Sequence, residues 1–98
     1  MSKYSREVEI PGRSAKELYE TVSKDIDRFI AKSPIGGFEV IRNEANLSVS
    51  VKSSMANATL NCVENRIRLD ANLSLFAAPF RGKLDDAIDR WLAKTFHV

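Results

Sequence analysis

The chain has 98 residues, enough for one domain with one core, and an apolar share of 44 % with a charged share of 29 % argues against disorder. Fifteen basic and thirteen acidic side chains leave a net charge of +2, a bias too weak to indicate nucleic acid or an anionic membrane as a partner. We therefore expect a single domain, residues 1–98, without a large enclosed active site.

The numbers of cysteine and histidine residues limit the kinds of covalent and metal sites that the chain can form. Cys62 is the only cysteine and His97 the only histidine, so neither an intrachain disulfide nor a Cys/His metal cluster can form. The charged N-terminus lacks the apolar stretch of a signal peptide, and no apolar window approaches the roughly 20 residues that span a bilayer. The sequence predicts a cytoplasmic protein with no cofactor, no metal and no transmembrane segment.

Residues 4–10 alternate between apolar and polar side chains, as a half-buried strand requires, although Arg6 interrupts the apolar face. Pro11 and Gly12 end this strand. Ser14 and Glu17 then have the spacing of a capping box, so a helix begins here. Its apolar side chains follow at three- and four-residue steps and form one stripe: Ala15, Leu18, Tyr19, Val22, Ile26, Phe29 and Ile30.

Four short strand patterns come next, and simple hairpin registers bring all their apolar faces to one side of a sheet. The predicted turns lie at Glu44-Ala45, Ser54-Met55 and Glu64-Asn65. The predicted pairs are Phe38 with Val51, Val40 with Val49, Val49 with Leu60, Val51 with Ala58, Ala58 with Ala71, Leu60 with Leu69, Cys62 with Ile67 and Val63 with Arg66. Leu73 and Leu75 continue the phase of the last strand, so we expect both in the core.

Beyond Pro79 a second helical stripe is formed by Leu84, Ala87, Ile88, Trp91, Leu92, Thr95 and Phe96. The element order is therefore β-α-β-β-β-β-α. One apolar sheet face and two helices with one apolar stripe each predict an α+β two-layer sandwich, in which a curved antiparallel sheet packs against two helices. We expect the other sheet face to be solvated and to carry Glu39, Ser48, Ser50, Thr59, Asn61, Arg66, Arg68, Asp70, Asn72 and Ser74.

Two stretches resemble known families. The opening "YSREVEIPGRSAKELYETVS" resembles helix-grip proteins of the START/polyketide-cyclase superfamily, which implies a miniature helix-grip fold because those proteins are usually longer. The final third, "RIRLDANLSLFAAPFRGKLDDAIDRWLAKTF", resembles the polyhydroxyalkanoic acid system protein family, whose members end with a strand, a Pro-Phe-basic-Gly-Lys motif and an amphipathic helix. That family occurs beside bacterial polyester-storage genes, so the resemblance implies an association with storage metabolism.

The chemistry-bearing residues favour a protein that is not an enzyme. His97 lies next to the C-terminal residue, and Cys62 falls on the predicted core face, where a free cysteine is usually inert. Asp85, Asp86 and Asp89 crowd one helix, where their ordinary role is to complement the helix dipole and to be solvated.

The sequence gives only weak support for two other functions, binding of a small anion and binding of nucleic acid. Arg81 and Lys83 flank a helix N-terminus, an arrangement that can hold an anion, but the Walker pattern is absent. Nucleic acid is disfavoured because the predicted outer face carries no aromatic side chain beside its basic residues, Arg42, Lys52, Arg66 and Arg68.

The uncharged run from Leu75 to Phe80, closed by two basic residues, is the remaining functional signal. We expect Phe80 to be buried as a staple at the helix entry and Phe76 to face a partner. The candidate ligand or partner contacts are Phe76, Phe80, Arg81, Lys83 and Trp91. The sequence thus predicts a non-enzymatic interaction module that contacts a polyester granule surface or a partner protein, and it leaves a homodimer surface open.

The alternative is a miniature helix-grip protein that binds a small apolar or lipid-like ligand between the sheet and the C-terminal helix. The first hypothesis predicts an exposed apolar patch around residues 76–80 and a filled interior, and the alternative predicts a cavity beneath Trp91. That cavity would be lined by Tyr19, Phe38, Leu60, Leu69, Leu73, Leu84, Ile88 and Trp91.

Overall fold

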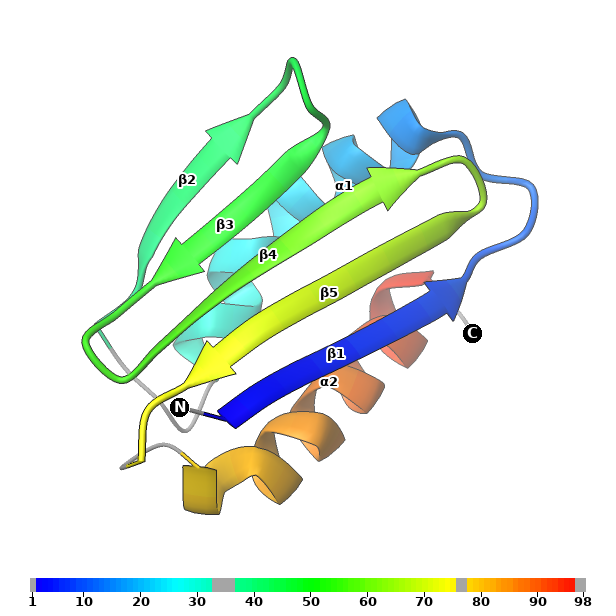
Figure 1. Ribbon diagram of the computed structural model, residues 1–98. Helices are drawn as coiled ribbons and strands as arrows, with labels where there is room; N and C mark the ends of the chain where they lie inside the picture. Colours follow the sequence, from blue (N-terminus) through cyan, green and yellow to red (C-terminus); the bar gives the residue numbers. More distant parts are fainter. Residues whose placement is uncertain (1, 33–36, 76–77, 97–98) are drawn as a thin grey trace.

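A computed structural model describes residues 2–32, 37–75 and 78–96, in which a five-stranded antiparallel sheet carries two helices on one face (Figure 1). The strand order is β1-β5-β4-β3-β2, so the first strand of the chain lies beside the last. This arrangement confirms the predicted α+β sandwich and its element order. The elements are β1 (Ser2–Glu9), α1 (Ala15–Ala31), β2 (Glu39–Asn43), β3 (Ser48–Lys52), β4 (Ala56–Val63), β5 (Arg66–Leu73), the short 3-10 helix η1 (Ala78–Phe80) and α2 (Arg81–Phe96).

Helix α1 begins where the sequence predicts. The hydroxyl of Ser14 accepts a hydrogen bond from the backbone N–H of Glu17 and donates one to the Glu17 carboxylate, both at 3.2 Å. The helix packs on the middle of the sheet through Leu18, Val22 and Ile26, which are almost fully buried. None of the described helices is both long enough and apolar enough to cross a membrane.

Two of the three predicted hairpin registers are confirmed. Leu60 lies opposite both Val49 and Leu69, and Val63 lies opposite Arg66 across the turn at Glu64 and Asn65. Asn65 has a positive φ of 62°, which asparagine tolerates better than most residues. These registers bring the apolar faces of β3, β4 and β5 to the side that carries the helices.

The register predicted for the β2–β3 hairpin is wrong by two residues, because Val40 lies opposite Val51 and Arg42 opposite Val49. The reason is the turn: four residues, 44–47, join the strands, and the Asn43 side chain accepts a hydrogen bond from the backbone N–H of Asn46 at 3.1 Å. A shift of two residues keeps each side chain on its face, so Val40 still points toward the helices.

Arg42 lies on an edge strand, as the sequence allowed, but its side chain is not on the open sheet face, because it shares the face of Val40 two residues before it. Arg42 lies on the helix side, where its guanidinium donates to the backbone oxygen of Ser23 at 2.8 and 3.2 Å and to the Ser23 hydroxyl at 2.9 Å. It also pairs with Asp27 at 3.3 Å. Arg42 therefore fastens the edge strand β2 to α1.

The core confirms most of the predicted apolar set, with Leu75 as the main exception. Leu73 is 1 % exposed, but Leu75 is 80 % exposed and was wrongly assigned to the core. The alternation of inward and outward side chains does not continue to Leu75, because β5 ends at Leu73. The next backbone N–H, of Ser74, donates to the carbonyl of Met55 at 2.8 Å. On the other sheet face, Ser48 is buried rather than solvated.

One turn residue joins two distant parts of the chain. Asn65 accepts a backbone hydrogen bond from Ile10 and donates one to the carbonyl of Arg13, both at 2.8 Å, and its side-chain oxygen accepts a third from the N–H of Gly12 at 3.0 Å. The β4–β5 turn thereby holds the connection between β1 and α1.

Candidate functional site

The predicted contact residues of the β5–α2 connection lie together only in part. Phe80 ends η1 and is partly buried, with the Lys83 ammonium 6.0 Å from the centre of its ring. Arg81 and Lys83 are exposed in the first turn of α2, and the Arg81 guanidinium lies 5.6 Å from the centre of the Tyr4 ring. Phe76 lies outside the described residues, as does His97. We call Leu75, Phe80, Arg81 and Lys83 the β5–α2 surface.

Trp91, the fifth predicted contact residue, does not belong to that surface. It lies ten residues beyond Arg81, about 15 Å along the helix, and is only 8 % exposed. Its indole contacts Phe29 and Phe96, with ring centres 5.3 and 6.2 Å apart. Its Nε1–H donates to the carboxylate of Asp25 at 2.6 Å.

Asp25 forms a polar junction between the two helices that the sequence analysis missed. Its carboxylate accepts hydrogen bonds from Trp91 and from the Thr95 hydroxyl, the latter at 2.8 Å, and pairs with Arg28 at 3.6 Å. Burial opposes ionisation, but these two hydrogen bonds and the charges of Arg28 and Lys32 outweigh it and lower the pKa of Asp25 below its ordinary value.

The lowered pKa of Asp25 predicts a loss of stability in acid. A carboxyl with a lower pKa in the folded state stabilises the fold above the unfolded value, about 3.9, and this contribution disappears as the pH falls through the folded value. We expect the free energy of unfolding of wild type to exceed that of Asp25→Asn near neutral pH, and the difference to shrink below about pH 4. Urea unfolding of both proteins between about pH 2 and pH 7 measures it. A difference that stays constant with pH would contradict the assignment.

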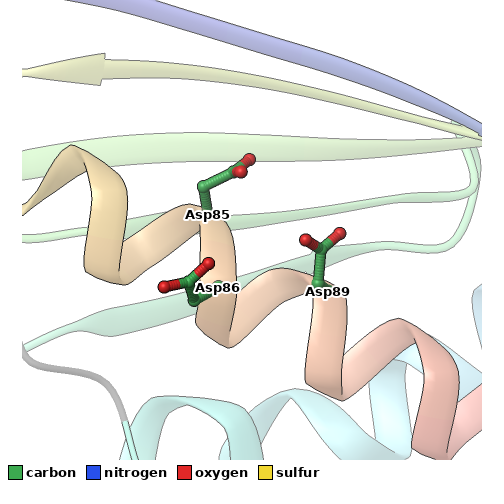
Figure 2. Close-up of side chains that lie close together, drawn as sticks. All are labelled: Asp85, Asp86 and Asp89. Carbon is green, nitrogen blue, oxygen red and sulfur yellow. The ribbon is translucent and has the colours of Figure 1, made fainter.

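The three carboxylates near the start of α2 form a cluster, with one oxygen of each within 4.8 Å of the others (Figure 2). Asp85 and Asp89 project from the same side of the helix. The Arg6 guanidinium pairs with both of them, at 3.3 Å to Asp85, and the Tyr4 hydroxyl donates to Asp85. The Arg6 guanidinium balances part of the negative charge of this cluster, and its ion pairs with Asp85 and Asp89 join β1 to α2.

The Cys62 thiol has the environment of a core residue, as predicted. It is 4 % exposed, and burial raises its pKa to about 11. The thiolate is therefore scarce at neutral pH, which disfavours nucleophilic chemistry there.

A small apolar cavity of about 60 Å³ lies between the sheet and the helices. Phe38, Leu60, Leu69, Leu73, Leu84, Ile88 and Trp91 are among its lining residues, as predicted, and Tyr19 is not. Within the described part of the chain, every buried polar side-chain atom has a hydrogen-bond partner. The cavity is several times smaller than the roughly 300 Å³ of typical ligand pockets.

A much larger hollow, about 1110 Å³, opens on the outer side of the helices between α1 and α2, and nothing in the sequence analysis indicated it. We call it the helix groove. Its lining is formed by Arg13, Glu17, Glu20, Thr21, Lys24, Asp25, Arg28, Phe29 and Lys32 near or on α1 and by Ala87, Arg90, Trp91, Ala93, Lys94 and Thr95 on α2. The hydrogen bonds of Asp25 to Trp91 and Thr95 cross its floor.

Comparisons with known proteins agree with the fold. No protein-family model and no curated protein matches the chain. A DUF4468 family protein from Bacteroides ovatus has a TM-score of 0.65 at 16 % identity, and the match covers 98 % of this chain and 86 % of that one. A TBP-like protein from Parabacteroides distasonis has a TM-score of 0.59 at 20 % identity and covers 70 % of this chain.

The match spans about half, 52 %, of the TBP-like protein. At these identities the likeness shows the fold alone, a small α+β domain. Neither protein carries the name of the polyhydroxyalkanoic acid system family, so the storage connection enters below only as a proposal.

Proposed function

We propose that this domain is a non-enzymatic, cytoplasmic interaction module associated with polyhydroxyalkanoate storage, and that its β5–α2 surface contacts a granule or a partner protein. The observation that carries the proposal is the position of Leu75, which leaves 80 % of its surface in water. Burial of such a side chain against an apolar surface is worth about 1.5–3 kcal/mol.

The neighbours of Leu75 support a contact function. Phe80 is partly buried five residues further on, and the exposed Arg81 and Lys83 follow it. An apolar side chain followed closely in sequence by two cations suits a surface that is apolar and carries some negative charge. The storage association depends on the resemblance of the C-terminal third to the polyhydroxyalkanoic acid system family. The motif "PFRGK", which is part of that resemblance, lies in the β5–α2 surface.

The chemistry of the other candidate residues supports a role outside catalysis. The Cys62 thiol is buried and protonated, and the Asp85 and Asp89 carboxylates pair with Arg6. A buried, protonated thiol is not an activated nucleophile, and the ion pairs with Arg6 give the two carboxylates a structural role.

Recovery on isolated polyhydroxyalkanoate granules tests the proposal. We expect Leu75→Ser and the double variant Phe76→Ser/Phe80→Ser to bind at least about tenfold more weakly than wild type, the change that loss of 1.5 kcal/mol produces. Val63→Ser is the matched control, because Val63 is 46 % exposed at the opposite end of β4. Circular dichroism confirms that each variant is folded.

Two outcomes would overturn granule contact. The first is equal recovery of wild type and both folded variants, and the second is an equal loss in Val63→Ser. If recovery fails but Leu75→Ser converts a dimer of this chain to a monomer in analytical ultracentrifugation, the β5–α2 surface is a homodimer interface instead.

The alternative function, binding of a small apolar or lipid-like ligand, is favoured by one observation: the cavity lies in the predicted place. At about 60 Å³ it would have to expand to admit such a ligand. Thermal unfolding with saturated fatty acids of eight to twelve carbons tests this function. A rise in Tm that is lost in Ala58→Leu, which fills the cavity, would support it, and an unchanged Tm would exclude it for these ligands.

A further inference from the structure

We propose that the helix groove binds an acidic segment of a partner protein that places an apolar side chain between α1 and α2. This site goes beyond the proposed function, because it lies on the far half of α2 from the β5–α2 surface. The groove combines a positively charged lining, cations that have no carboxylate partner among the described residues, and aromatic side chains at its floor.

The groove concentrates the positive charge of the molecule. Six of the fifteen basic side chains line it, with three of the thirteen acidic ones. The nine basic and ten acidic side chains that remain leave the rest of the chain close to neutral. An approaching acidic segment is therefore attracted to the groove in preference to the other surfaces.

Most of the groove cations are available to a ligand. The sheet arginines are already paired, Arg66 with Glu7 at 2.8 Å and Arg68 with Asp70 at 3.2 Å. In contrast, among residues 2–32, 37–75 and 78–96, no carboxylate oxygen comes within 4.0 Å of the cations of four exposed groove residues, Lys24, Lys32, Arg90 and Lys94.

The floor of the groove suits an apolar anchor. The Phe29 and Trp91 rings contact each other there at a tilt of 46°, and the hydrogen bond from Trp91 to Asp25 fixes the indole. Ala87 and Ala93 add small side chains that leave room on the α2 side. Aromatic groups held in one orientation lose little entropy when a partner packs on them.

A protein segment fits this groove better than a membrane or a nucleic acid. The groove is concave, so a flat bilayer reaches its rim but not its floor. The carboxylates of Glu17, Glu20 and Asp25 would repel a continuous phosphate backbone. A segment with separate acidic and apolar side chains can place its carboxylates beside the groove cations and its apolar side chains away from the groove carboxylates.

Selection from a random library of 16-residue peptides displayed on phage tests the proposal directly. We expect the enriched peptides to combine aspartate or glutamate with at least one large apolar residue. A synthetic peptide of the enriched sequence should then shift the fluorescence of Trp91, the only tryptophan of the chain, as it saturates the groove.

Charge reversal in the groove provides the decisive variants. Lys24→Glu/Arg90→Glu should weaken binding of the synthetic peptide by about tenfold or more. Lys3→Glu/Lys52→Glu makes the same change in net charge on the outer sheet face, where both lysines are exposed, and should leave the affinity within about twofold. Leu75→Ser should bind as wild type does, which separates this site from the β5–α2 surface.

Three results would overturn the proposal: enriched peptides without acidic residues, equal losses in the two charge-reversal variants, or no enrichment over an unrelated bait. The same Trp91 titration with vesicles containing phosphatidylglycerol and with single-stranded DNA distinguishes the other occupants. Tighter binding of either than of the peptide would assign the groove to that ligand class instead.

Discussion

Replacement of Trp91 by alanine is expected to lower the free energy of unfolding by about 3–5 kcal/mol, the range for a large aromatic side chain removed from a core. Trp91 is 8 % exposed, contacts two other aromatic rings and supplies one of the two interhelical hydrogen bonds to Asp25. The truncation leaves a cavity and also removes a donor from a carboxylate that is partly buried. Urea unfolding followed by far-ultraviolet circular dichroism measures the change.

Trp91→Phe is the control, because phenylalanine keeps most of the packing and removes only the Nε1–H donor. We expect Trp91→Phe to lower the free energy of unfolding by less than half as much as Trp91→Ala does. A loss below about 1 kcal/mol for Trp91→Ala would show that Trp91 is not part of the packed interior. Natural domains have a free energy of unfolding of about 5–15 kcal/mol, so the loss expected for Trp91→Ala is a large share of the stability of the domain.

The two leucines at the end of β5 are expected to respond in opposite ways. Leu73→Ala should lower the free energy of unfolding by about 2–5 kcal/mol, because Leu73 is 1 % exposed among the core side chains. Leu75→Ala should change it by no more than about 0.5 kcal/mol, because Leu75 is 80 % exposed and its truncation leaves no cavity.

Each of these variants is the control of the other, since they lie two residues apart and remove the same atoms. Equal losses in Leu73→Ala and Leu75→Ala would contradict the structure and restore the sequence-based prediction that both leucines are buried. A small loss in Leu75→Ala is also required by the proposed function, which needs Leu75 for contact rather than for folding.

Much of the fold could be predicted because apolar alternation and hairpin turns constrain each other. The β4–β5 register followed from one turn at Glu64-Asn65, and a one-residue slip there would have turned Leu60 and Leu69 toward water. The β2–β3 register could not be fixed in this way, since a slip of two residues leaves Val40 on the same face. The observed register depends on the four-residue turn, in which the Asn43 side chain accepts from Asn46 and the backbone N–H of Leu47 donates to the carbonyl of Glu44.

The groove and the interhelical junction could not be predicted because they depend on how two helices distant in sequence approach each other. One signal was nevertheless present. Asp25 continues the spacing of Leu18, Val22 and Phe29, so a charged residue interrupts the apolar stripe of α1. Arg6 gave the same signal in β1, and both residues contact α2. A charged residue at a position of the apolar face indicated a contact with another helix or strand, but it did not indicate which one.

The position of β1 beside β5 also determines when the domain can be completed during synthesis. The partner residues of β1 lie at positions 66–73, so β1 waits unpaired until the whole of β5 has been synthesised. The hydrogen bonds of Asn65 to Ile10, Gly12 and Arg13 form at the same late stage. We therefore expect the nascent chain to protect the β2–β4 meander first and to expose the amphipathic edge of β1 to chaperones until the last hairpin closes.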